Sequence, residues 1–322
     1  GRSDVAVIAA CRTPSRLQAG FAGAVRAGDL RDPAYRREVV RDVDVVCHTG
    51  TWGSFWGHQA LEQSHFFEPN VDLIESSISA GVRRFIQTSS VVIAATPGAT
   101  EEAGGRTTVD DFAPATHTGF WPHLDRLVDV EHFMRANSHR GTQMITMRLG
   151  HFVGAGNQAG LVPALIPRLR TRLVPWLGGG RARMPVVADT DLGEAFALAA
   201  TAAGLADYES FTIGGPDLPT VREVITCVAE AAGVPRPRVS VPYGAGAAFG
   251  ALMEALHPVL PGSSPFLTRS IVHVARDWPI TNEYARRKLG YRPTKAWRTA
   301  VAETVAESAA RGYPWPLLAQ VP

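Results

Sequence analysis

Short apolar runs alternate with helical patterns along the first two-thirds of this 322-residue chain, and no other feature limits its fold as strongly. Strands separated by helices form βαβ units, in which the strands are parallel. The predicted strands span residues 4–12, 25–27, 43–48, 84–89 and 143–149, and the predicted helices span residues 35–40, 68–80 and 124–137. We also expect a helix to open at Thr13, with Pro14 at its first position. The alternation predicts an α/β protein with a doubly wound parallel sheet.

The pattern loosens in the second half of the chain. Further predicted helices cover residues 161–173, 191–203 and 220–232. Thr220 and Glu223 have the spacing of a capping box at the start of the last of these. We expect two parts, residues 1–156 and a smaller lobe of residues 157–322, with some elements of the lobe returning to the sheet.

Composition argues against several kinds of partner. A hydrophobic content of 45%, a charged content of 19% and a net charge of +2 are typical of a soluble globular protein and predict no nucleic-acid surface. No apolar run reaches the roughly 18–20 residues of a membrane span. Residues 247–260 come nearest, but Glu254 and His257 favour an amphipathic core or lid helix over a membrane-surface helix. With three widely spaced cysteines, we expect a cytoplasmic protein whose partner is a small molecule.

Several short motifs follow one another along the chain. They are Gly28-Asp-Leu-Arg-Asp32, Ala80-Gly-Val-Arg-Arg-Phe85, Thr88-Ser-Ser90, Met147-Arg-Leu-Gly150 and Leu289-Gly-Tyr-Arg-Pro293. With these motifs, the chain from Asp4 to about Pro293 resembles the extended short-chain dehydrogenase/reductase family, the NAD-dependent epimerase/dehydratase and 3β-hydroxysteroid-dehydrogenase-like proteins. The resemblance implies a Rossmann-type, dinucleotide-binding domain in residues 1–156 and a mainly substrate-binding C-terminal lobe.

The family's catalytic pair is replaced in this chain. In the family, a strand ending in Thr-Ser-Ser precedes a helix with Tyr-x-x-x-Lys, and a Glu follows that Lys by four residues. Counting back from Glu131 places His123 at the Tyr position and Leu127 at the Lys position, whereas Ser90 keeps the family's serine. A neutral imidazole titrates near pH 6.5 without help, so we expect Ser90 and His123 to be catalytic. The alternative is a histidine that only packs at the helix start beside Trp121.

Tyr284 and Lys288 have the family's Tyr-x-x-x-Lys spacing but lie far along the chain from the serine strand. We expect them to belong to a surface helix without a catalytic role. The histidines and acidic residues show no metal-ligand spacing, so no metal site is expected.

The resemblance implies NADP or NAD as the cofactor. It places Asp29 and Leu30 beside the adenine ring. It puts Arg12 where an acidic residue selects NAD, which favours NADP, with a solvated surface arginine as the alternative. The other residues that it assigns to the cofactor cleft are His48, Thr49, Gly50, Thr88 and His151. A satisfied core histidine is the alternative for His151.

The family's first strand and its Gly-x-x-Gly-x-x-Gly turn, which seats the dinucleotide pyrophosphate, have no counterpart in this sequence. That strand lies at the centre of the family's sheet. We therefore expect roughly 20–30 residues upstream of Gly1, the usual length of one βα unit. The alternative is a protein that lacks the turn and binds no dinucleotide. The family's Asn-Val-x-Gly at a helix start is also replaced, by Phe66-Phe-Glu-Pro69.

Aromatic residues lie where the family's substrate cleft opens. Trp52, Trp56 and Trp121 suggest an apolar or aromatic substrate, with core packing as the alternative for some of them. Arg183 lies roughly where sugar-nucleotide epimerases hold a diphosphate.

Together these features predict an atypical NAD(P)-dependent epimerase/dehydratase- or oxidoreductase-like enzyme for a small apolar or aromatic metabolite, with His123 as the acid/base. One alternative is a non-redox lyase, isomerase or cyclase on the same scaffold. Another is a non-catalytic protein that senses a ligand or dinucleotide. The oligomeric state is open, with a homodimer as one candidate.

Overall fold

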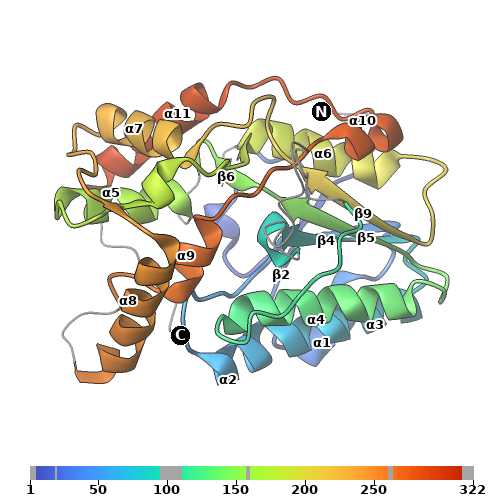
Figure 1. Ribbon diagram of the computed structural model, residues 1–322. Coiled ribbons are helices and arrows are strands. Elements are labelled where there is room, and N and C mark those ends of the chain that lie inside the picture. Colours follow the sequence, from blue (N-terminus) through green and yellow to red (C-terminus); the bar gives the residue numbers. More distant parts are fainter. Residues whose placement is uncertain (1–4, 19, 95–110, 157–159, 260–263, 314–322) are drawn as a thin grey trace.

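A four-stranded parallel sheet forms the centre of the computed structural model, which describes residues 5–18, 20–94, 111–156, 160–259 and 264–313. The sheet has the order β3-β4-β5-β9, with strands β3 (Val45–His48), β4 (Arg84–Ser90), β5 (Gln143–Leu149) and β9 (Tyr208–Ile213). One face is covered by α1 (Pro33–Val39), α3 (Glu68–Ser79) and α4 (Pro122–Asn137), and the other by α6 (Asp189–Thr201) and α10 (Glu283–Leu289) (Figure 1). This layered architecture confirms the predicted fold class.

The sheet is apolar on both faces because helices cover both. In β4, Phe85 packs with the core under α3 and α4, and Ile86 packs with the core under α6 and α10. Neither residue is exposed, as expected where successive side chains of a strand point to opposite covered faces. The parallel register, which pairs Ser90 with Leu149, brings the carboxyl ends of the strands to one edge. Ligands of open α/β sheets bind at this edge.

Two shorter strands, β1 (Ile8–Cys11) and β2 (Ala24–Ala27), form a separate parallel pair. Within the described ranges, no strand bonds to both this pair and β3. The expected upstream βα unit and the boundary at residue 156 stay predictions.

The helix expected from Thr13 is wrong. Pro14–Arg16 form a single 3-10 turn (η1), and Leu17 returns to extended backbone. The Thr13 side chain caps nothing, and none of the turn residues is buried. A longer helix would have no apolar face to pack, and short unpacked helices are marginal in water.

The helix before β4 begins earlier than the predicted residue 68. It runs from α2 (Gln59–Glu62) through a π turn (η2, Gln63–Phe67) into α3. Glu62 and Phe66 explain the extension, because they are 0% and 1% exposed and anchor this turn to the protein interior. A glutamate contributes nothing to an apolar pattern, so the sequence did not predict the turn.

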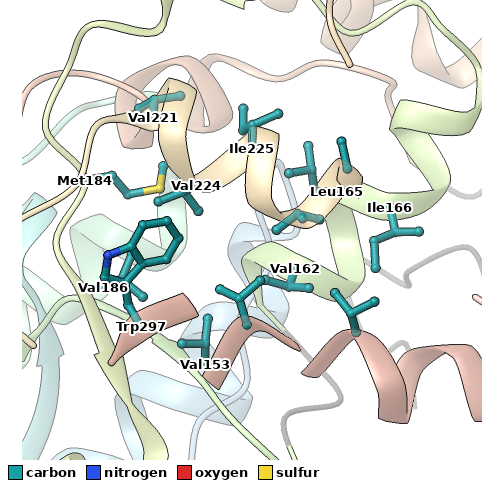
Figure 2. Close-up of a cluster of buried hydrophobic side chains, with 14 of the residues drawn as sticks. Val153, Val162, Leu165, Ile166, Met184, Val186, Val221, Val224, Ile225 and Trp297 are labelled. Carbon is teal, nitrogen blue, oxygen red and sulfur yellow. The ribbon is translucent and has the colours of Figure 1, made fainter. Parts of the chain in front are cut away.

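A second core lies in the C-terminal half. It is built from β6 (His151–Val153), α5 (Leu161–Arg170), β8 (Val186–Ala188), α7 (Val221–Ala231) and α11 (Trp297–Ala310). Figure 2 shows side chains of these elements, among them Val153, Val224 and Trp297, gathered into one buried cluster. The capping box at the start of α7 is confirmed: Thr220 N donates to Glu223 Oε2 at 2.8 Å, and Thr220 Oγ1 accepts from Glu223 N.

Two helices, α8 (Tyr243–Leu256) and α9 (Arg269–Val274), project beside this lobe (Figure 1). A short parallel pair, β7 (Trp176–Leu177) and β10 (Ser240–Val241), precedes them. Helix α8 begins four residues before the predicted start at residue 247 and leaves Phe249, Leu252 and Leu256 exposed. In the part of the chain that the structure describes, no helix has the length and apolar character of a membrane span.

Candidate active site

A buried carboxylate holds the ring of His123. His123 is the second residue of α4, after Pro122, which suits a first helical position because its missing N–H would have no partner there. The ring's Nδ1 lies 3.0 Å from Glu62 Oε2, and Phe66 packs edge-on against the ring at 5.1 Å between centroids. The His123 side chain is 16% exposed, whereas that of Glu62 is 0% exposed. The fold therefore brings together Glu62 and His123, 61 positions apart in the sequence, and leaves only the histidine partly exposed.

The loop before α2 completes the contact. Ser54 N donates to Glu62 Oε1 at 2.8 Å, and Trp121 Nε1 donates to the Ser54 carbonyl at 2.7 Å. Each carboxylate oxygen of Glu62 thus has its own partner. Gly53 lies flat against the ring, since a Cβ at this position would come within 2.9 Å of three atoms of His123. Only glycine fits here without displacing the imidazole.

This arrangement decides which ring nitrogen is available. An ionised carboxylate only accepts hydrogen bonds, so the contact with Glu62 favours a proton on Nδ1 of His123. Among the described residues, no hydrogen-bond partner lies at Nε2. A histidine fixed in this way can accept or donate a proton at Nε2, which is the requirement for general acid/base chemistry.

Ser90 ends β4 at the expected edge of the sheet. Its Oγ accepts from Val92 N at 3.4 Å and so caps a 3-10 turn (η3, Val91–Ile93). That turn and Leu127 belong to one buried cluster, and Leu127 is 8% exposed. The Lys position is therefore filled by a core residue. No hydrogen bond joins Ser90 directly to His123 within the residues that are described.

The strand ends place part of the expected cofactor cleft together. A Cβ on Gly50 would lie 3.1 Å from His48 Cε1 and 3.9 Å from Leu30 Cδ1, so these three residues are neighbours. Thr88 Oγ1 donates to the His48 carbonyl at 3.0 Å and links β4 to β3. Thr49 is exposed next to them. The structure therefore brings together these residues, which the resemblance assigns to the cofactor cleft.

The carboxylate of Asp29, expected beside the adenine ring, is already engaged by a neighbouring side chain. Arg31 forms hydrogen bonds with both of its carboxylate oxygens, at 2.8 to 3.2 Å, and this contact holds the pKa of Asp29 below its usual range. The exposed Arg12 adds to the same effect from a greater distance. The Asp29 carboxylate is therefore occupied by Arg31.

Two histidines of the predicted cleft are held in the protein interior. Burial lowers the pKa of His48 to about 4 and that of His151 to about 4. His151 Nε2 is buried and has no hydrogen-bond partner in the described parts of the chain. Both rings are therefore neutral at pH 7.

The predicted aromatic residues fall into two groups. Trp121 is 5% exposed and stacks on Phe55, so it packs beneath the loop that precedes α2. Trp52 and Trp56 are partly exposed, and the ring of Trp56 meets His257 at the end of α8 at 4.3 Å. The loop and α8 therefore meet beside the site.

Three other sequence predictions concern groups outside this site. Arg183 forms an ion pair with Asp277 at 2.6 Å. Tyr284 of α10 is partly buried and donates to Glu209 at 2.6 Å, and Lys288 lies 3.8 Å from the same carboxylate. No cluster of potential metal ligands occurs in the residues searched, which are those described.

Sequence reasoning missed Glu62 and Gly53. Neither belongs to a family motif, and the π turn interrupts the helical period just after Glu62. A buried partner 61 residues away leaves no local signal. The replacement at Phe66 was noticed, but its contact with His123 was not.

Comparisons with known proteins agree with the fold and the motifs. The model of the NAD-dependent epimerase/dehydratase family matches residues 2–214, more than half of the chain. A 2-alkyl-3-oxoalkanoate reductase of Stenotrophomonas maltophilia is 28% identical over 302 residues, which cover 91% of this chain and 89% of the relative.

Solved structures give the same architecture. The UDP-glucose 4-epimerase of Thermus thermophilus in complex with NAD has a TM-score of 0.64 and 18% identity, covering 91% of this chain and 86% of its own. A double mutant of dTDP-glucose 4,6-dehydratase from Streptomyces venezuelae, with NAD bound, has a TM-score of 0.66 and 20% identity, covering 97% and 90%. At these identities the likeness shows the fold alone. With the match of the family model, it follows that this chain belongs to the NAD-dependent epimerase/dehydratase family.

Proposed function

We propose that the protein is an NAD(P)H-dependent reductase of a small apolar carbonyl compound, with His123 as the proton donor. The observation that carries this proposal is the position of His123. It stands where the family's tyrosine stands, with Nδ1 held by Glu62 and Nε2 without a partner among the described residues. The name of the Stenotrophomonas relative, a reductase of oxo acids with alkyl chains, supports the reaction type.

The protein's own groups supply the proton and the orientation. The reaction adds a hydride to the carbonyl carbon and a proton to its oxygen, and the nicotinamide provides the hydride when it is bound. Protonated His123 donates from Nε2 to the carbonyl oxygen and keeps its Nδ1 contact with Glu62. Ser90 Oγ receives a hydrogen bond from Val92, so its own hydroxyl proton is free to orient the same oxygen.

Apolar surface near the site supports the substrate class. Trp56 contacts the end of α8, and the same helix exposes Phe249, Leu252 and Leu256. Exposed aromatic and aliphatic groups at a cleft favour a ligand with an apolar body and few polar atoms. Arg183 is engaged by Asp277, which leaves no described support for a diphosphate there.

For the cofactor, we favour NADPH over NADH. The exposed Arg12 acts electrostatically on Asp29, and an arginine at the end of this strand suits a 2′-phosphate. The residues that would hold the adenosine are Leu30, His48, Thr49 and Gly50. A cytoplasmic location, a small-molecule partner and a homodimer belong to the same proposal.

The test begins with the full-length protein. Titration with NADPH and NADH, followed by nucleotide fluorescence, should show binding of both and tighter binding of NADPH. A 2-alkyl-3-oxo acid should then be reduced, and His123→Ala should lower kcat by at least about 100-fold. His132→Ala, an exposed histidine on the same helix, is the matched control and should retain wild-type rates. Unchanged activity in His123→Ala would remove the proposed acid.

A second function has one specific observation in its favour. Leu127 is a core residue where relatives place the ribose-binding lysine, so a proton-transfer isomerase that needs no hydride remains the competing function. Absence of nucleotide binding by the full-length protein, together with loss of an isomerase activity in His123→Ala, would favour this function over the reductase.

A further inference from the structure

We propose that Glu62 is a positioning residue that fixes the orientation and tautomer of His123. This inference rests on the proposed role of His123 and adds a residue from a different part of the chain. In the family, a cation serves the catalytic residue, because a lysine favours the ionised tyrosine. Here the pairing has the opposite sign, since a buried anion faces an imidazole that becomes positive when it carries the transferred proton.

The first support is burial. Glu62 is 0% exposed, and an ionised carboxylate without partners is costly in the protein interior. Its two oxygens are instead used separately, one by His123 Nδ1 at 3.0 Å and one by Ser54 N at 2.8 Å. The backbone of Ser54 thus fixes one oxygen of the Glu62 carboxylate, and the other oxygen orients the imidazole of His123.

The second support is the shape of the helix that carries Glu62. Glu62 directly precedes the π turn of residues 63–67 and Phe66 lies within it, and both side chains contact His123. Turns of this type are rare and occur frequently at functional sites. Phe66 restrains the ring by its edge while Gly53 lies against it. The ring is therefore enclosed on three sides.

The third support is the absence of a competing charge in the described surroundings of His123. On its own helix, Asp125 accepts from Thr118 and Gly119, and Arg126 pairs with Asp129. The described histidines of this region contact aromatic rings: His58 packs against Trp52 and Trp56, His65 against Trp52, and His273 against Trp121. Glu62 is the charged group in hydrogen-bond contact with the imidazole.

The test reads the tautomer directly. The long-range proton–nitrogen NMR spectrum of the protein with labelled histidine should show His123 protonated at Nδ1 when neutral. Its signal is identified by its loss in His123→Asn. Wild-type protein with the proton on Nε2 would overturn the proposal, whatever the variants do.

Variants then separate positioning from general support of the fold. Glu62→Gln should change the tautomer populations of His123 and lower kcat by at least about tenfold, with KM within about threefold. Glu75→Gln is the matched control, because its carboxylate forms an exposed pair with Arg140. If Glu62→Gln does not fold, Glu62→Asp tests the same contact, since the shorter side chain draws the carboxylate away from Nδ1. An unchanged tautomer and kcat in a folded variant would contradict the proposal.

This test is independent of the proposed reaction. The tautomer is measured without substrate or nucleotide, so it can stand even if no reductase activity is found. Conversely, activity that survives in His123→Ala would remove the reductase mechanism and leave the Glu62 contact intact as a structural fact.

Discussion

At the scale of single residues, the substitutions in the site depend on one another. A histidine at residue 123 without neighbours to hold it would have neither a fixed tautomer nor a fixed ring orientation. Glu62, Gly53 and Phe66 supply the contact, the space and the packing that the imidazole requires. Leu127, where the resemblance places a lysine, packs in the buried core.

Gly53 gives a direct test of the space around the ring. Gly53→Ala would place a Cβ within 2.9 Å of three His123 atoms, so the imidazole must move. We expect kcat to fall by at least about tenfold and stability to fall by about 1–3 kcal/mol, the usual cost of overpacking. Steady-state kinetics and urea unfolding measure both effects. Gly193→Ala, where a Cβ would meet open space, is the control, and equal behaviour of the two variants would refute the steric account.

At the scale of elements, α4 is fastened to the sheet by a buried ion pair. Arg148 of β5 and Glu131 of α4 are 0% and 3% exposed in their side chains, and Arg148 Nε donates to Glu131 Oε2 at 3.2 Å. The helix that carries His123 is therefore held at two places, by this pair in its middle turns and by the Glu62 contact at its start.

Breaking this pair should destabilise the fold strongly. Arg148→Met leaves the Glu131 carboxylate buried and unpaired, which we expect to cost about 3–5 kcal/mol in the free energy of unfolding. Arg140→Met, which breaks the exposed pair with Glu75, should cost at most about 1 kcal/mol. Chemical denaturation measures both. A second change, Glu131→Leu, should recover most of the loss, and no recovery would argue against an unpaired charge as the cause.

The elements themselves were largely predictable from the sequence. The parallel sheet follows from apolar runs such as residues 84–89 and 143–149, because the hydrophobic period is local. The prediction failed at Thr13, where the local cap signal had no core to pack against. It also missed α2 and the π turn, whose stability comes from the distant contact of Glu62 rather than from an apolar pattern.

The site was only partly predictable for the same reason. Family motifs predicted Ser90 and His123 as site residues from their spacing along the chain. They could not show that Ser90 caps η3, that Trp121 is buried, or that Arg31 engages Asp29, since these are contacts of the folded chain. Glu62 lies outside every motif, and only the packing of α2 on α4 reveals it.

At the scale of the whole molecule, acid should destabilise the protein before its carboxylates titrate. His48 and His151 have folded pKa values of about 4, below the unfolded value of about 6.5, because burial disfavours the charged ring. A lowered histidine pKa means that the unfolded chain binds protons first. Their contribution is therefore complete above pH 6.5 and is lost as the pH falls toward 4.

Urea unfolding between pH 7.5 and 5 measures this dependence. Once the pH is well below 6.5, each histidine should lower the free energy of unfolding by about 1.4 kcal/mol for every pH unit. His48→Gln should reduce the slope, and His151 and His273, whose pKa values burial also lowers, should account for the remainder. A stability that stays constant between pH 7.5 and 5 would show that the two rings are not held neutral.

In the proposed reaction, His123 donates a proton to the carbonyl oxygen while a hydride passes from the nucleotide to the carbonyl carbon. A single turnover of the full-length protein with NADPH deuterated at C4 and a 2-alkyl-3-oxo acid tests it most directly. We predict that deuterium appears on the carbinol carbon of the product, and that its rate of appearance falls at least about 100-fold in His123→Ala. Transfer at an unchanged rate in the variant, or no transfer by the wild-type protein, would contradict this mechanism.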